Sequence, residues 1–185
     1  FDKMKEAFGD FGISDSENFY KTVNRVSLGY IRTEADELHY NLHIMLRYEL
    51  ECALVSGDLS VGNLEDAWNT RFLNDFGFPV DRAANGILQD VHWSQGLFGY
   101  FPAYTLGNVY AACLYEKMSI DIPTLQKDLE KGDTSKGTRW LKEMLQLHGC
   151  RYSAQDLVTG ACGKAPSVLP LVDYINSKFT DLYGL

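Results

Sequence analysis

The sequence carries signals that begin and end helices along almost its whole length. Helices often begin after a residue whose side chain caps free backbone N–H groups, and they often end at a left-handed glycine. Ser14 and Glu17 have the spacing of a capping box, and Gly57, Gly77 and Gly184 each follow a helix-forming run. These signals predict an all-α fold, with residues 1–8 as the tail of a helix and further helices near 14–26, 33–55, 63–77, 104–120, 123–131, 135–148, 153–162 and 167–183.

One segment alone has a pattern typical of a strand. Val26, Leu28, Tyr30 and Arg32 alternate along the chain, so we expect at most one short strand near 26–32. The 185 residues are 45% hydrophobic, which is enough for one sizeable core, and they contain no repeat or low-complexity linker. We therefore expect residues 1–185 to form a single helical lobe.

Charge and cysteine content exclude several classes of protein. Lys and Arg number 17 against 25 Asp and Glu, a net charge of −8, which disfavours a nucleic-acid partner because such affinity comes from clustered basic residues. The four cysteines form no CxxC pair and indicate a reducing compartment. The most apolar stretch, residues 100–115, is interrupted by Pro102, Gly107 and Asn108, so we expect no membrane segment.

The helix predicted from Thr33 can be phased at about 100° per residue, which predicts its buried face. The residues on that arc are Leu38, Leu42, Met45, Leu46, Leu50 and Ala53. Glu49 falls inside the same arc. A buried carboxylate needs a partner, so we interpret Glu49 as a member of a structural salt bridge or as part of a wet helix end, in preference to a cleft residue.

Two histidines on this helix have the spacing of zinc ligands. His39 and His43 stand four residues apart, as in an HExxH motif, but Tyr40 occupies the position of the general-base glutamate. Asp36 and Arg47 lie on the same flank, so an ordinary polar network explains these residues better than a metal site does.

Polar and aromatic residues gather in residues 86–114, among glycines and just before a helix. The polar, titratable and aromatic residues of this segment are Gln89, Asp90, His92, Trp93, Tyr100, Tyr104 and Asn108. Such a segment describes either a cleft wall or an aromatic loop of the core, and composition alone favours the core loop slightly.

Three motifs in order resemble the carboxypeptidase Taq type of zinc metallocarboxypeptidase. They read IRTEADE at 31–37, GILQDVHW at 86–93 and GYFPAYTLGN at 99–108. Residues 43–51 (HIMLRYELE) and 174–185 (YINSKFTDLYGL) also look like that family. The resemblance covers nearly the whole chain, and three ordered motifs are far more specific than one.

The zinc ligands of that family are missing from this chain. The family holds zinc with an HExxH helix and a glutamate in a later motif, both upstream of the region that this chain resembles. The four histidines here do not form them. The resemblance therefore implies the C-terminal portion of a larger, mainly helical enzyme that is a cytoplasmic homodimer, and a fragment that binds no catalytic zinc and is inactive alone. Two alternatives remain: a non-catalytic helical binding or oligomerisation module, and a separate hydrolase that uses His39 and His43.

The resemblance also implies roles for single residues in removing one residue from the C-terminus of a peptide. Arg32 is the candidate for binding the substrate carboxylate, because a guanidinium matches a carboxylate in a bidentate way. His92 and Tyr104 are the candidates for the catalytic groups that stabilise the oxyanion or orient the substrate. The residues expected to support substrate binding are Tyr100, Gln89 and Asp90, with Trp93 packing the wall.

Overall fold

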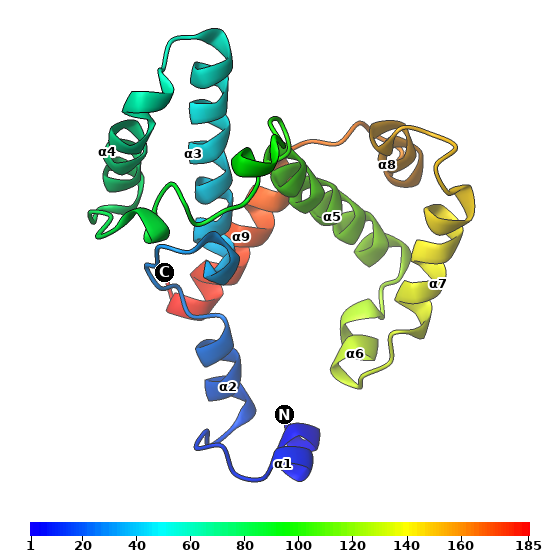
Figure 1. The fold of residues 1–185 in the computed structure, drawn as a ribbon. Helices are drawn as coiled ribbons and strands as arrows, with labels where there is room; N and C mark the ends of the chain where they lie inside the picture. Colours follow the sequence, from blue (N-terminus) through cyan, green and yellow to red (C-terminus); the bar gives the residue numbers. More distant parts are fainter. The chain divides into compact units, whose positions relative to one another are not determined.

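The computed structural model describes residues 1–185, and every regular element in it is a helix (Figure 1). The predicted all-α fold is confirmed. The α-helices are α1 (Asp2–Phe8), α2 (Ser16–Val23), α3 (Glu37–Ser56), α4 (Leu64–Phe76), α5 (Pro102–Asp121), α6 (Leu125–Glu130), α7 (Ser135–Met144), α8 (Ala154–Cys162) and α9 (Leu169–Tyr183). The short 3₁₀ turns are Arg32–Glu34, Val61–Asn63, Ala83–Asn85, Trp93–Gln95 and Gln146–His148.

The contacts within the chain divide it into two compact units, Phe1–Pro102 and Ala103–Leu185. The single lobe expected from the sequence stays a prediction. None of the helices combines the length and the hydropathy that crossing a bilayer requires.

The helix ends follow the capping chemistry of the sequence, with shifts of a few residues. The side chain of Asp36 accepts hydrogen bonds from the backbone N–H groups of Leu38 and His39, so α3 begins at Glu37 and not near Thr33. Asp15, not Ser14, caps α2. Gly57, Gly77, Gly163 and Gly184 end α3, α4, α8 and α9 in the left-handed conformation, as their positions predict.

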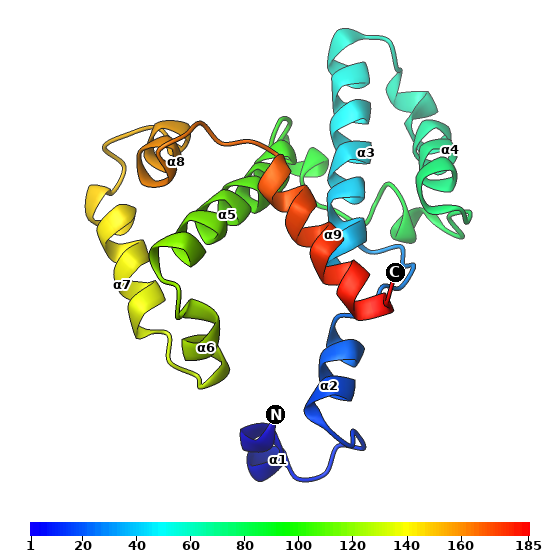
Figure 2. The same ribbon diagram turned by 180° about the vertical axis from the view of Figure 1, so that it is seen from behind.

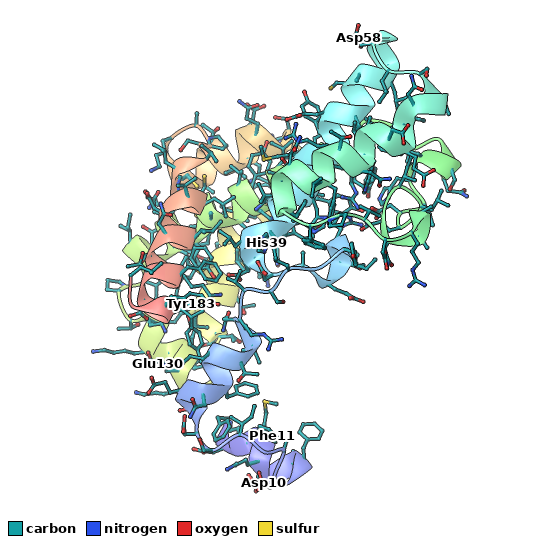
Figure 3. All side chains as sticks on the ribbon, turned by 90° about the vertical axis from the view of Figure 1, so that its left-hand side faces the viewer. Asp10, Phe11, His39, Asp58, Glu130 and Tyr183 are labelled. Atoms are coloured by element: carbon teal, nitrogen blue, oxygen red, sulfur yellow. The ribbon has the colours of Figure 1, made fainter.

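The first unit is built on the neighbouring helices α3 and α4, which Figure 2 shows side by side from behind. In Figure 3, His39 marks the N-terminal end of α3 and Asp58 the turn beyond its C-terminal end. The buried core between the helices is mainly aromatic on the α4 side: Leu46 and Leu50 of α3 form one cluster with Leu64, Trp68, Phe72 and Phe76 of α4. The candidate site packs against this core through the ring of Trp68.

The buried face of α3 differs from the predicted arc. Met45 is 46% exposed and Leu38 is 41% exposed, whereas the buried members include His43, Arg47 and Glu51. Glu49 also points to solvent, where it pairs with Arg71 of α4. Its interpretation as a member of a salt bridge fits this contact, whereas its predicted burial was wrong. Leu46 and Leu50 are buried as predicted, but the helix also buries a row of polar residues, so its buried face is rotated away from the arc that hydrophobicity predicted.

Residues 26–32 form no strand. The segment is extended at Ile31, but the structure contains no strand with which it could pair. The side chain of Gln89 donates from Nε2 to the carbonyl of Tyr30 at 3.0 Å and accepts from the backbone N–H of Arg32 at 2.9 Å. One amide side chain thus satisfies the backbone groups on both sides of Ile31.

The second unit has a conventional apolar core. One cluster holds Met118, Leu125, Trp140 and Ala161, and another holds Cys113, Val158 and Cys162. The indole N–H of Trp140 donates to Asp121 at 2.8 Å, so the large ring is buried with its polar atom satisfied. The ion pairs of the second unit, such as Lys136 with Asp128, lie at the surface.

Candidate functional site

The loop after α4 carries the GILQDVHW motif, and its first residue is held close to the core. A Cβ atom on Gly86 would lie 2.9 Å from Cγ1 of Val80 and 3.3 Å from Nε1 of Trp68. Glycine therefore lets the loop pack directly on α4. This close packing positions Gln89 and Asp90, three and four residues further on.

Asp90 is bound by two arginines from different parts of the chain. Its Oδ1 accepts from Nη2 of Arg32 at 2.8 Å and from Nε at 3.2 Å. Its Oδ2 accepts from Nε of Arg47 at 2.7 Å, and Nη2 of Arg47 lies 2.6 Å from the same atom. We call these three residues the Arg–Asp–Arg cluster. The direct contacts join two positive charges to one negative charge.

The cluster is shielded from water. Arg47 is fully buried at 0% exposure, and Arg32 is 6% exposed. The guanidinium of Arg47 lies 4.7 Å from the ring of Trp68 and 5.4 Å from that of Phe101. These aromatic faces attract the cation and partly replace its hydration.

Electrostatics inside the cluster follow from its charges. Burial alone would raise the pKa of Asp90, but hydrogen bonds and charge from Arg32 and Arg47 outweigh it and lower that pKa below its usual value. Burial lowers the pKa of Arg47 to about 10 despite the attraction of Asp90. All three members are therefore charged at neutral pH.

His43 lies one helical turn before Arg47 and is neutral. It is 1% exposed, neither ring nitrogen has a hydrogen-bond partner, and its ring lies 4.4 Å from that of Phe76. Burial, and then the positive charge of Arg47, lower the pKa of His43 to about 3. Only its backbone carbonyl joins the cluster, by accepting from Nη1 of Arg47 at 2.7 Å. The polar network expected from the sequence is thus realised only in part.

Arg32 has a further polar contact besides Asp90. Its Nη1 donates to the hydroxyl of Tyr40 at 3.1 Å, and its guanidinium lies 5.9 Å from the ring of Phe101. The predicted carboxylate-binding residue is consequently held on two sides, by Asp90 and by Tyr40.

Glu51 is a second buried carboxylate on the same face of α3. It is 3% exposed, and it accepts from Nε1 of Trp93 at 2.8 Å and from the backbone N–H of Gly99 at 3.1 Å. These bonds attach both ends of the 93–99 loop to α3. Trp93 thus packs against the core and anchors this loop through its indole N–H, while its place in a cleft wall stays a prediction.

His92 lies beside the cluster. It is 8% exposed, its Nδ1 is 3.8 Å from Oδ1 of Asp90, and its ring is 4.4 Å from that of Phe101 and 5.5 Å from that of Tyr100. Tyr100 is half exposed. Five predicted residues, Arg32, Gln89, Asp90, His92 and Tyr100, therefore belong to one neighbourhood of the first unit.

Tyr104 belongs to the second unit, in the first turn of α5. Its helix begins at Pro102, a position that suits proline because it needs no backbone N–H there. Its predicted catalytic role stays a prediction.

Residues of this chain do not fit a metal centre. Nδ1 of His39 is 2.9 Å from the carboxylate of Asp36, and His43 is buried against Phe76. Across the whole chain, no three His, Cys, Asp or Glu side chains gather in a way that could hold a metal ion.

Sequence reasoning placed Arg47 in a polar network with Asp36, His39 and His43, but it did not connect Arg47, Glu51 or Tyr40 with the candidate site. A signal was available: His43, Arg47 and Glu51 are spaced four residues apart, which places three polar groups on one face of a helix. A polar row of this kind beside an apolar one indicates a helix that buries charged groups against partners elsewhere in the chain.

Comparisons with known proteins agree with the motifs. The family model of the carboxypeptidase Taq (M32) metallopeptidases matches residues 1–179. Thermostable carboxypeptidase 1 of Thermus thermophilus is 39% identical over 184 residues, and carboxypeptidase 1 of Bacillus subtilis is 41% identical over 189. Each alignment covers 100% of this chain but only 36% and 37% of the respective relative.

Solved structures show the same relation. The M32 carboxypeptidase of Deinococcus radiodurans R1 superposes with a TM-score of 0.96 at 37% identity, covering 100% of this chain and 38% of that one. Metallocarboxypeptidase 1 of Trypanosoma cruzi gives a TM-score of 0.91 at 34% identity, covering 95% of this chain and 37% of that one. The chain thus spans little more than a third of the relatives it matches, and it belongs to the carboxypeptidase Taq (M32) family of metallopeptidases.

Proposed function

We propose that this chain is the part of a zinc-dependent metallocarboxypeptidase that recognises the free C-terminal carboxylate of a peptide, and that Arg32 binds that carboxylate. The carrying observation is the Arg–Asp–Arg cluster, in which two buried guanidinium groups share the single carboxylate of Asp90. A desolvated cluster with one excess positive charge attracts an anion more strongly than a solvated arginine does.

The position of Arg32 supports its role within the cluster. Arg47 is wholly enclosed, whereas Arg32 retains a small exposed fraction and lies on a 3₁₀ turn at the edge of the core. A substrate carboxylate would balance the charge that Asp90 leaves uncompensated. An internal peptide bond carries no such charge, which would explain a preference for chain ends.

The remaining predicted residues take supporting roles in this proposal. His92, beside the cluster, and Tyr104, on α5, would orient the substrate or stabilise the developing oxyanion. Tyr100 would line the path to the substrate, while Gln89 fixes the backbone of Arg32. Metal ligands would come from another part of the enzyme, a cytoplasmic homodimer in this proposal, and this segment alone would be inactive.

Replacing Arg32 by Ala in the complete enzyme tests the proposal. We expect kcat/KM on a blocked dipeptide with a free C-terminus to fall by an amount equivalent to about 2–4 kcal/mol, because the substrate carboxylate loses its charged partner. Asp90 would still be paired with Arg47, so the metal content and the melting temperature should change little.

Arg71→Ala is a matched control. Arg71 also joins a carboxylate of α3, Glu49, but at the surface. The kinetic constants of the Arg71→Ala enzyme should match those of the wild type. Kinetic constants of Arg32→Ala within twofold of the wild type would remove Arg32 from the substrate site.

A further inference from the structure

Arg47 is the one member of the cluster that is fully enclosed. It is 0% exposed, yet it uses its guanidinium for two separate attachments: Nε binds Asp90, and Nη1 binds the carbonyl of His43 at 2.7 Å. Aromatic rings of Trp68 and Phe101 lie within 5.4 Å of the same group. Removing a guanidinium so completely from water carries a large desolvation cost, and packing alone does not require a charged side chain at this position.

We propose that Arg47 is a positioning residue, which acts on the substrate carboxylate only through Asp90 and Arg32. This inference rests on the proposed function, because it needs Arg32 to bind the carboxylate. It adds that the affinity of Arg32 for an anion is set by a residue that never touches the substrate.

Two physical effects carry the inference. The first is orientation: Arg47 fixes Oδ2 of Asp90, so Oδ1 is presented in one place to Nε and Nη2 of Arg32. The second is charge. With Arg47 present, the negative charge of Asp90 is shared between two cations; without it, Asp90 alone would neutralise Arg32, and a second carboxylate would be repelled.

These two effects are separable by substitution. Arg47→Met removes both the charge and the planar fork while keeping a long apolar side chain. Arg47→Lys keeps the charge and loses the fork. Orientation and charge together predict that Met is the more damaging replacement and that Lys restores part of the anion affinity.

The decisive experiment is a double-mutant cycle in the complete enzyme with Arg32→Met and Arg47→Met. KM and kcat are measured on a blocked dipeptide, and the inhibition constant of the released amino acid reports on carboxylate affinity directly. We expect Arg47→Met alone to raise KM and the inhibition constant by about tenfold or more, with a smaller change in kcat. In the Arg32→Met background, Arg47→Met should raise KM and the inhibition constant by less than about twofold, because Arg47 acts on the substrate only through Arg32, which is already absent.

Each outcome decides between the inference and the function beneath it. If Arg32→Met raises KM but Arg47→Met does not, or if their effects multiply, the positioning role is overturned and the proposed function stands. If Arg32→Met leaves KM unchanged, the proposed function fails and the inference fails with it. Arg71→Met is the matched control and should leave both constants unchanged.

Arg47→Lys also covers the case in which Arg47→Met does not fold. The same cycle with Lys is expected to show a smaller rise in the inhibition constant that again disappears in the Arg32→Met background. An inhibition constant within twofold of the wild type for Arg47→Lys would then overturn the inference, since a lysine cannot reproduce the fork that holds Asp90.

Discussion

The two units of this protein bury different kinds of residue. The second unit covers its helices with an ordinary apolar core around Met118 and Trp140, and its ion pairs are at the surface. The first unit has an apolar core too, but beside it α3 buries His43, Arg47 and Glu51. Apolar groups would fill the same space at lower cost in desolvation, so this polar row is not the arrangement that stability alone would favour.

The largest effect that would test this difference comes from removing the shared carboxylate. We expect Asp90→Ala to destabilise the protein by about 3–5 kcal/mol, because it leaves two buried guanidinium groups without a counter-ion. Asp128→Ala in the second unit is the control: Asp128 also pairs with a cation, Lys136, but at the surface, and its loss should have little effect. Denaturant unfolding measures both. Equal effects of the two substitutions would show that the buried cluster is not energetically distinct.

Acid should weaken the first unit through His43. The folded-state pKa of His43 is lowered from 6.5 to about 3, so the unfolded chain binds a proton that the folded chain refuses. The stability due to neutral His43 is therefore complete above pH 6.5 and is lost as the pH falls toward 3. Between pH 7.5 and 4.5 we expect this group to remove about 3 kcal/mol from the free energy of unfolding.

The comparison of His43→Phe with His148→Phe isolates this contribution. Between pH 7.5 and 4.5, the free energy of unfolding of His43→Phe should fall less than that of the wild type. The difference should equal the contribution of His43, about 3 kcal/mol. His148→Phe, at an exposed position of the second unit, is the control for exchanging a histidine for a phenylalanine. An unaltered pH dependence for His43→Phe would contradict a neutral, buried imidazole.

A smaller effect tests how closely the site loop is packed. Gly86→Ala places a methyl group 2.9 Å from Cγ1 of Val80, and we expect a loss of about 2 kcal/mol from overpacking. Gly107→Ala, inside α5, meets no atom within 4 Å, and alanine favours helix, so this variant should be as stable as the wild type or slightly more so. Melting temperatures that moved together in the two variants would show that the loop yields to the added methyl group.

Much of the fold was predictable because helix ends depend on neighbouring residues. Gly57 and Gly184 mark the ends of α3 and α9, since a left-handed residue stops a helix whatever surrounds it. The start of α3 was predicted about three residues too early, because Thr33 and Asp36 are both good caps and only Asp36 also accepts a hydrogen bond from Ser27. That choice depends on a neighbour outside the helix.

The candidate site was predictable in part. The motifs brought Arg32, Gln89, Asp90 and His92 to attention, and the structure places these four side chains together in the first unit. What the motifs could not reveal is that Asp90 is shared with Arg47. Residues 47 and 90 are joined only through the packing of α3 against the loop after α4, and local patterns carry no information on that pairing.

The sequence by itself determined an all-helical chain, most of its helix ends and, through three ordered motifs, its family. These features depend on local capping and on motif spacing. Only the tertiary structure decided which face of α3 is buried and that two guanidinium groups share one carboxylate. The reason is physical: a charged side chain is stable inside a protein only beside its partner, and that partner can come from anywhere in the chain.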